Sequence, residues 1–248
     1  MHTEHHTLSS PATAGPPSRR VIDAPTRMFH WLLALCFAGA YVSAGQEPWQ
    51  ALHEALGYSV LGLLLFRLLY GFWGPPQSRW TALWGKVRPL PGWMRAVWGA
   101  WRGRLGQPPN WVQGQNMAGA LITVLMLAVA VSVLISGISQ VQSLESEWLE
   151  SVHELLGQVW LGLVLLHLVW LLGISLLRRK NAARPMLSGR QSGPGPDLVK
   201  NKRVGLALLL LVALLAYWGW EWSHGTGLHL QQATVAEQDE ADQDEIEP

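Results

Sequence analysis

Long apolar segments with almost no charge limit the folds open to this chain more than any other feature. Five stretches, at about 28–46, 53–73, 117–139, 152–177 and 204–220, approach or exceed the roughly 20 residues that a helix needs to cross a bilayer. Only 14% of the 248 residues are charged, against about 25% in soluble domains. The sequence therefore predicts an all-α integral membrane protein with five transmembrane helices, and it argues against a soluble enzyme or a disordered chain.

The distribution of Lys and Arg predicts how these helices are oriented. Segments 1–27, 74–116 and 178–203 hold every basic residue of the chain except Arg67. The segments between the other helix ends contain none, and the last of them, 221–248, is strongly acidic. Because basic loops stay in the cytoplasm, we expect a bacterial plasma (inner) membrane protein with a cytoplasmic N-terminus and a periplasmic C-terminus.

The remaining segments complete the predicted organisation. A disordered cytoplasmic tail at 1–20 precedes a four-helix domain at 21–177, followed by a basic cytoplasmic loop at 178–203, a fifth span at 204–220 and an acidic periplasmic tail at 221–248. The acidic tail is either a solvated end or a docking site for a basic partner. The long loop after the second span interleaves Trp with Arg and Lys, which suits the lipid headgroup region and makes nucleic-acid binding a poor alternative.

Four of the nine histidines lie within or at the ends of predicted spans: His30, His53, His153 and His167. His53 and His153 begin spans on the outer side, whereas His30 lies near the inner surface. His167 follows His153 by 14 residues on one helix, which places it about 21 Å deeper and within about 40° of the same face. The four residues therefore form two pairs at matched depth, His53 with His153 and His30 with His167.

Paired imidazoles facing each other in a helix bundle are what a haem iron needs for axial ligation. With both axial positions filled, no position stays open for oxygen, which favours electron transfer. Zinc needs three or four converging ligands and fits poorly. The single cysteine, Cys36, excludes an internal disulfide and covalent haem attachment through C-x-x-C-H. We therefore interpret the pairs as ligands of two non-covalently bound haems.

The two outer histidines belong to an internal repeat. Segment 52–71 recurs at 152–171, and both copies contain the pattern H-E-x-L-G. Gly57 and Gly157 lie one turn after the histidines, on the same face, where a missing side chain leaves room for a flat macrocycle. Small residues that let helices pack closely are an equally good explanation for either glycine taken alone.

Two arginines are candidates to bind the propionates of the inner haem. Arg67 occupies the repeat position of His167, and its depth matches the inner pair, where carboxylates would form charge-assisted contacts. The alternative is that Arg67 extends to the lipid headgroups with no cofactor. Arg27, just before His30, is a second candidate, with an ordinary flanking anchor as its alternative.

At these residues the chain resembles the prokaryotic cytochrome b561 family, which includes the b-type cytochrome subunits of nickel–iron hydrogenases. The matching elements are DAPTRMFHW (23–31), LHEALGYSVLGLLLFRLLYGFWG (52–74), QNMAGA (115–120) and VHELLGQVWLGLVLLHL (152–168). The resemblance implies a four-helix membrane bundle that holds b-type haem and passes electrons between a quinone pool and a protein partner. By position, it implies that the four paired histidines are the haem ligands, and it includes Asn116 and Gly119 without indicating their role.

Our leading hypothesis is thus a di-haem electron carrier of a respiratory chain, acting between quinone and a redox protein such as a periplasmic c-type cytochrome, a dehydrogenase or a hydrogenase. Two alternatives stay open: a cofactor-free proton relay or transporter, and a membrane anchor subunit of an oxidoreductase complex. No catalytic acid, base or nucleophile is identified, so enzymatic activity of its own stays open. We expect the protein to contact membrane lipid and not to bind nucleic acid. Homodimerisation through the third or fifth span also stays open.

Overall fold

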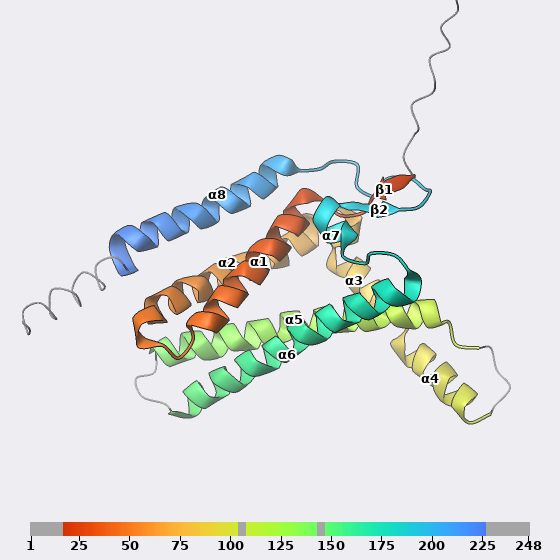
Figure 1. Cartoon of the computed structure of the whole chain (residues 1–248), viewed down its shortest axis with the longest axis horizontal. Helices are drawn as coiled ribbons and strands as arrows, with labels where there is room; N and C mark the ends of the chain where they lie inside the picture. Colours follow the sequence, from red (N-terminus) through yellow and green to blue (C-terminus); the bar gives the residue numbers. More distant parts are fainter. Residues whose placement is uncertain (1–16, 104–107, 143–146, 227–248) are drawn as a thin grey trace, which may run out of the picture.

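The long helices of this protein run side by side along one axis. A computed structural model describes residues 17–103, 108–142 and 147–226, and this part of the chain is mostly helical (Figure 1). The long helices are α1 (Ala24–Ser43), α2 (Gln50–Trp73), α5 (Trp111–Gln142), α6 (Glu147–Arg178) and α8 (Val204–Glu221). Helices α1, α5 and α8 run in one direction, and α2 and α6 run in the other.

The charge of the connecting segments separates the two ends of the bundle. The links between α1 and α2 and between α5 and α6 contain no Lys or Arg. The segments at the opposite end, where α1, α5 and α8 begin, carry the great majority of the described Lys and Arg residues. We name this the basic end. The observed alternation of helix directions thus places the basic segments together, as the charge distribution predicts.

Four segments of the described chain are long and apolar enough to cross a membrane: Glu47–Trp73, Trp111–Gln140, Glu147–Arg178 and Val204–His224. They coincide with four of the five predicted spans. The remaining predicted span, 28–46, falls on α1, which is not apolar enough to be counted with these four. Arg27, His30 and small residues such as Gly39 lower the mean hydropathy of this helix. The structure therefore supports a multi-pass membrane protein with four helices that are long and apolar enough to cross a membrane.

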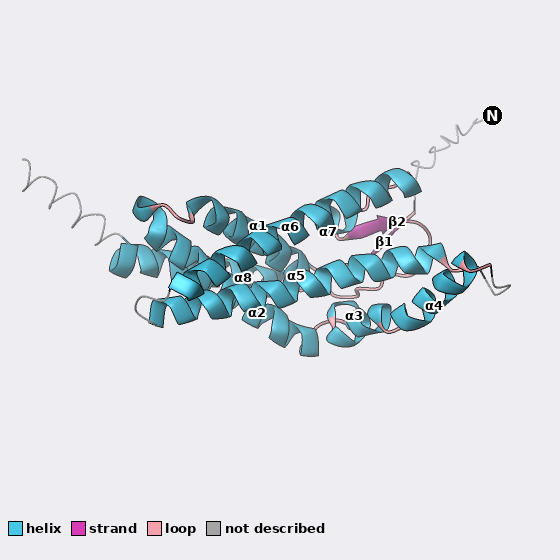
Figure 2. Ribbon diagram, turned by 90° about the horizontal axis from the view of Figure 1, so that it is seen from below, coloured by secondary structure: helices cyan, strands magenta, loops and turns pink. Residues whose placement is uncertain are grey.

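The segments at the basic end have structure of their own. Two short helices, α3 (Trp80–Val87) and α4 (Leu90–Trp101), lie in the long loop after α2, and η2 (Pro76–Ser78) precedes them. Helix α7 (Arg184–Ser188) leads into strand β2 (Arg190–Ser192), which pairs antiparallel with β1 (Ser18–Arg20). The predicted disordered tail, 1–20, thus ends in a strand, whereas residues 1–16 lie outside the described part. Figure 2 shows this small sheet and α4 at the same end of the bundle.

At the other end, η1 (Glu47–Trp49) links α1 to α2, and the π-helical turn η3 (Trp222–Thr226) follows α8. Most of the predicted acidic tail, including 231–248, lies outside the described residues.

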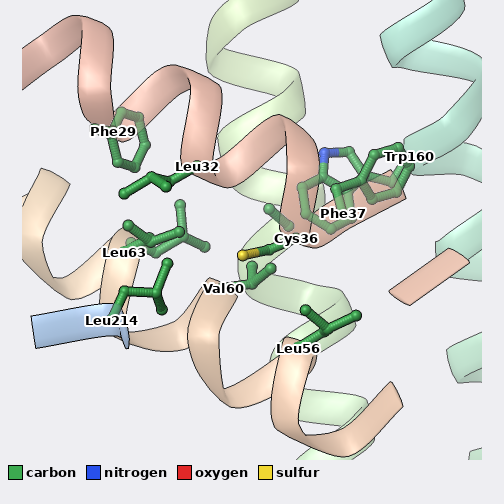
Figure 3. Close-up of a cluster of buried hydrophobic side chains, with 11 residues drawn as sticks. Phe29, Leu32, Cys36, Phe37, Leu56, Val60, Leu63, Trp160 and Leu214 are labelled. Carbon is green, nitrogen blue, oxygen red and sulfur yellow. The ribbon is translucent and has the colours of Figure 1, made fainter. Parts of the chain in front are cut away.

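The apolar core lies mainly between α1, α2 and α8. Its buried side chains come from α1 (Phe29, Leu32, Cys36, Phe37), α2 (Leu56, Val60, Leu63, Leu64), α5 (Ala130), α6 (Trp160) and α8 (Leu214) (Figure 3). Gly39 permits close packing of α1 on α2, because a Cβ atom there would lie 2.7 Å from a methyl group of Leu56. The α1–α2 pair and the α5–α6 pair are each closely packed, and far fewer close backbone contacts join one pair to the other. The predicted histidines lie on the facing elements of these two pairs.

Candidate functional site

His53 and His153 come together at the end of the bundle opposite the basic end. Their ring centres are 6.0 Å apart, and the ring planes make an angle of 82°. Imidazole nitrogens bind a first-row metal ion at about 2 Å, so two rings on opposite sides of one metal have centres roughly 6 Å apart. The first predicted pair therefore has a spacing that fits axial ligation of one iron.

Hydrogen bonds orient both rings of this pair. His53 Nδ1 lies 2.7 Å from the carbonyl oxygen of Ala40, and His153 Nδ1 lies 3.1 Å from the carbonyl oxygen of Val133. Because a carbonyl oxygen only accepts, each Nδ1 must carry the proton and donate it. The lone pair of each neutral imidazole then lies on Nε2, the nitrogen left for a metal.

Helix α5 shapes the space around His153 in a second way. The Ser136 hydroxyl donates to the Val133 carbonyl and also lies 3.1 Å from His153 Nδ1. At the next position, a Cβ on Gly137 would lie 2.9 Å from His153 Cε1. These residues are absent from the predicted site. A polar residue followed by glycine within the apolar third span is the signal that would have pointed to them.

The second predicted pair, His30 and His167, also comes within electrostatic range. Here the Nδ1 atoms of both rings are buried and have no hydrogen-bond partner in the described chain. A buried polar atom without a partner costs about 1–3 kcal/mol. The two nitrogens therefore lack a partner within the described chain, a need that a bound group or a water molecule would meet.

The two arginine candidates are placed differently. The Arg67 guanidinium lies 4.6 Å above the ring of Trp80, and its buried Nη1 has no partner in the described chain. Arg67 also interacts electrostatically with Asp23 and Tyr70. A buried, unused donor of this kind is what a propionate ligand would require.

Arg27 points toward the segment around α7. Its Nη1 donates to the carbonyl oxygen of Leu187 at 3.0 Å, and its guanidinium carbon lies 3.4 Å from where a Cβ of Gly189 would be. Its Nε is buried with no partner in the described chain. These contacts tie Arg27 to the basic end, and they neither support nor contradict a contact with a propionate.

Both glycines of the repeat border open space. A Cβ at Gly57 or at Gly157 would meet nothing within 4 Å. Among the described residues, neither glycine therefore has a packing partner on a neighbouring helix. Gly119, by contrast, faces Trp170, because its Cβ would lie 3.2 Å from the indole nitrogen. Its neighbour Asn116 accepts a hydrogen bond of 3.3 Å from Arg178.

A buried carboxylate near Arg67 is a feature that the sequence patterns did not identify. Asp23 is 1% exposed and accepts a hydrogen bond from the Tyr70 hydroxyl. Ser78 Oγ lies 3.5 Å from the same carboxylate, and Arg203 lies 3.4 Å from the Tyr70 oxygen. Asp23 and Tyr70 both lie within the family-like segments, but nothing in their spacing of 47 residues predicts the contact.

No cluster of three or more His, Cys, Asp or Glu able to hold a metal ion exists in the part of the chain that the structure describes. The histidines inside the bundle instead meet in twos, between helices that have few close backbone contacts. These features define a multi-pass α-helical membrane protein with paired imidazoles in its interior, where polar groups usually mark a functional site.

The family model of prokaryotic cytochrome b561 matches residues 21–189, and the chain belongs to this family. It is accordingly a b-type cytochrome of membrane electron transfer. No curated protein and no solved structure shows significant similarity to the chain. The matched range ends just after α7 and therefore leaves out α8.

Proposed function

We propose that this protein is a di-haem b-type cytochrome that carries electrons across a bacterial plasma membrane, between the quinone pool and a protein redox partner. The observation that carries the proposal is the His53–His153 pair, with ring centres 6.0 Å apart and each Nδ1 bonded to a backbone carbonyl. A b-type haem held by two imidazoles supplies one-electron chemistry with no coordination position open to oxygen.

The chain's own residues have distinct roles in this proposal. His53 and His153 would hold the outer haem, and the carbonyl groups of Ala40 and Val133 keep Nε2 of both rings free for its iron. His30 and His167 are the ligands of the inner site. Arg67 is the contact for inner propionates, supported by its unpaired Nη1. Gly57 and Gly157 leave room at the outer site.

An apolar layer separates the two sites. Trp160 lies seven residues after His153 and seven before His167 on α6, so it is about 10 Å along the helix from each. Its ring centre is 4.3 Å from that of Phe37, and its side chain is only 6% exposed (Figure 3). These aromatic rings exclude water from the middle of the bundle and hold the two histidine pairs apart.

We infer that α1 is a fifth membrane crossing. Its 20 residues give a length of about 30 Å, which matches the hydrocarbon thickness of a bilayer. It also lies antiparallel to α2 and shares the main apolar core. Five crossings with the basic end in the cytoplasm put the N-terminus inside and the C-terminus, with its acidic residues, in the periplasm. An acidic tail suits a basic c-type cytochrome as the outer partner.

The test is a dithionite-reduced minus oxidised absorption spectrum of purified protein, with haem quantified per polypeptide. We expect two b-type haems per chain. His53→Ala and His167→Ala should each remove about one haem, since each breaks a different pair. His224→Ala is the matched control, because His224 is exposed and its hydrogen bonds within the described chain go to its near neighbours Ser223 and Trp220.

The possible results separate the competing functions. One haem per chain would retain a cytochrome but eliminate one of the two pairs. A well-folded protein that takes up no haem under ample supply would refute the proposal and leave the proton relay and the membrane anchor. Loss of haem in His224→Ala equal to that in His53→Ala would refute the assigned ligands.

A further inference from the structure

A cavity of about 320 Å³ lies at the basic end, between the small sheet and the starts of two long helices. Four of the side chains that line it are cationic: Arg20, Arg27, Arg190 and Lys202. The one acidic residue of the lining is Asp23. Asp23 accepts a hydrogen bond from Tyr70, and its single negative charge leaves the lining with an excess of positive charge.

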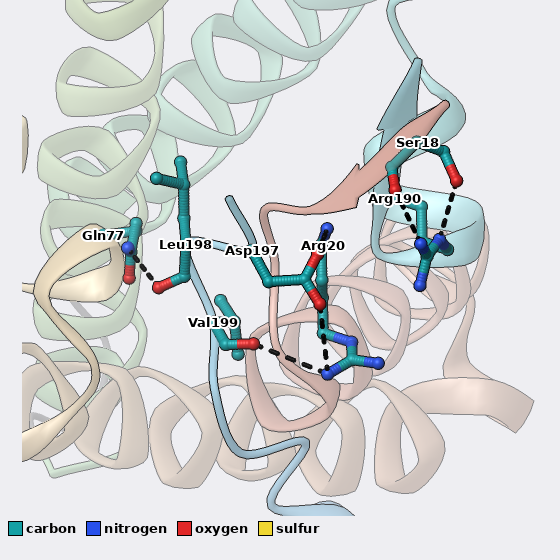
Figure 4. A network of polar contacts seen from close by, with 7 residues as sticks. All are labelled: Ser18, Arg20, Gln77, Arg190, Asp197, Leu198 and Val199. Atoms are coloured by element: carbon teal, nitrogen blue, oxygen red, sulfur yellow. Dashed lines mark hydrogen bonds and ion pairs between the residues drawn. The ribbon is translucent and has the colours of Figure 1, made fainter. Parts of the chain in front are cut away.

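The cations of this cavity lack enough carboxylates to balance them. In the described ranges of the chain one ion pair is found, in which Arg20 Nη1 lies 4.0 Å from Asp197 (Figure 4). Arg190 instead donates to the hydroxyl and the carbonyl of Ser18, at 3.0 and 2.7 Å. Like charges held around one small space repel each other, so this lining favours an anion inside.

Hydrogen-bond donors remain unused among these side chains. Arg27 uses Nη1 for the Leu187 carbonyl, but its buried Nε has no partner in the described chain. The ammonium group of Lys202 makes no hydrogen bond or ion pair with any described residue. A guanidinium carries five N–H donors and an ammonium three, so the cavity offers several donors to a ligand rich in acceptors.

The N-terminus of α8 adds positive potential, since Val204 begins this helix and lines the cavity. Ala24, at the start of α1, also lines the cavity, but its N–H donates to the Lys202 carbonyl and the next residue, Pro25, has no N–H. At the start of α8, Leu206 and Ala207 donate to the Arg203 carbonyl. The Val204 and Gly205 N–H groups come before them, where a helix has no internal acceptors to offer. Unpaired N–H groups together with the helix dipole favour bound anions.

From this convergence we infer that the cavity is a binding site for a phosphate group. A phosphate supplies several acceptor oxygens and one or two negative charges, which match the remaining N–H groups of Arg27 and Arg190 and the point charge of Lys202. The cavity lies at a membrane-proximal end of the bundle, so the phosphate belongs either to an anionic phospholipid headgroup or to a soluble phosphate ion. This inference does not depend on the proposed haem chemistry.

Binding there would join parts of the chain that are distant in sequence. The lining comes from β1, the start of α1, the α7–β2 turn and the segment before α8. The only backbone hydrogen bond between the starts of α1 and α8 in the described chain is from Ala24 N to the Lys202 carbonyl, at 3.1 Å. A phosphate in the cavity therefore strengthens the attachment of α8, which lies outside the family-matched range, to the core.

The test uses the full chain in nanodiscs of phosphatidylcholine. Thermal unfolding is followed at constant ionic strength while either phosphatidylglycerol is added to the nanodisc lipid or inorganic phosphate is added to the buffer. We expect a saturable rise in the unfolding temperature of the wild type. Lys202→Gln should weaken the apparent affinity about three- to tenfold, because one charge-assisted contact is lost. Lys200→Gln, the same change two residues away and outside the lining, should leave it unchanged.

Gly205→Asp is a second variant that retains its fold. A Cβ at Gly205 meets nothing within 4 Å, and an acidic residue in the first turn favours a helix. Gly205 is outside the lining but directly follows the lining residue Val204, so a carboxylate there adds negative charge at the start of α8 and should weaken or abolish the shift. A shift with phosphatidylglycerol alone supports the site with lipid as its source, whereas a shift with inorganic phosphate as well supports the site with the free ion as a source. Equal responses of wild type, Lys202→Gln and Gly205→Asp, or equal weakening in Lys200→Gln, would overturn the inference.

Discussion

Replacing Gly57 or Gly157 with alanine should separate the needs of the polypeptide from those of its cofactor. A Cβ at either position meets nothing within 4 Å. Alanine inside a helix is favoured over glycine by about 0.5–1 kcal/mol. The haem-free Gly57→Ala and Gly157→Ala proteins should therefore unfold at the same temperature as the wild type, or slightly above it.

Retention of the outer haem, by contrast, should be weaker in both variants than in the wild type. Each glycine lies four residues after a ligand histidine, so its missing side chain points within about 40° of the imidazole. A methyl group placed against a flat macrocycle overfills the site and costs about 1–3 kcal/mol. That cost corresponds to roughly 5- to 150-fold weaker retention of the outer haem. The inner haem should be unaffected.

Gly62→Ala and Gly162→Ala are the matched controls. These glycines follow the same histidines by nine residues, which places them on the opposite helix face, and a Cβ there also meets nothing within 4 Å. The assay is the rate of haem transfer to an apo-globin acceptor, together with thermal unfolding of the haem-free protein. Full haem retention in Gly157→Ala, or equal loss in Gly162→Ala, would show that these glycines do not border the cofactor.

Three further predictions concern other parts of the chain. Ser136→Ala should raise the midpoint potential of one haem by roughly 20–60 mV without haem loss in spectroelectrochemical titration, because an acceptor beside His153 Nδ1 is removed. Gly189→Ala should lower the free energy of unfolding by about 1–2 kcal/mol in thermal unfolding, since Gly189 has φ +75° and its Cβ would lie 2.8 Å from the Ile22 carbonyl oxygen. Gly173→Ala is the control and should not lower it, because a Cβ at Gly173 meets nothing within 4 Å. Electron transfer to a basic c-type cytochrome should slow with added salt and with deletion of 231–248, and a rate indifferent to both would exclude the acidic tail as a docking site.

The features that sequence reasoning predicted well are those set by the length of apolar segments and by the internal repeat. Four spans follow from the length of their apolar segments. The pairing of His53 with His153 follows from the repeat, because two copies of one pattern that start at the same membrane surface place their histidines at equal depth. The structure brings these rings together, and it brings His30 near His167. Their role as haem ligands stays a prediction.

The features that escaped prediction depend on contacts between distant residues. The Asp23–Tyr70 hydrogen bond joins two elements across 47 positions, and the β1–β2 pairing joins Ser18 to Ser192. Strands of three residues have no usable alternation of polar and apolar side chains. Helix α1 shows a different limit, because the residues that suit it to a site, such as His30, are those that reduce its hydropathy.

The even spacing of His153, Trp160 and His167 along α6 limits how the length of this helix can change. One residue inserted between the two histidines would turn one imidazole by about 100° relative to the other, away from its partner on the facing helix. Seven residues restore the direction to within about 20°. Even a seven-residue insertion moves one imidazole about 10 Å along α6, out of the depth of its partner on α1 or α2. A change in the length of this interval is therefore tolerated only together with an equal change in the facing helices.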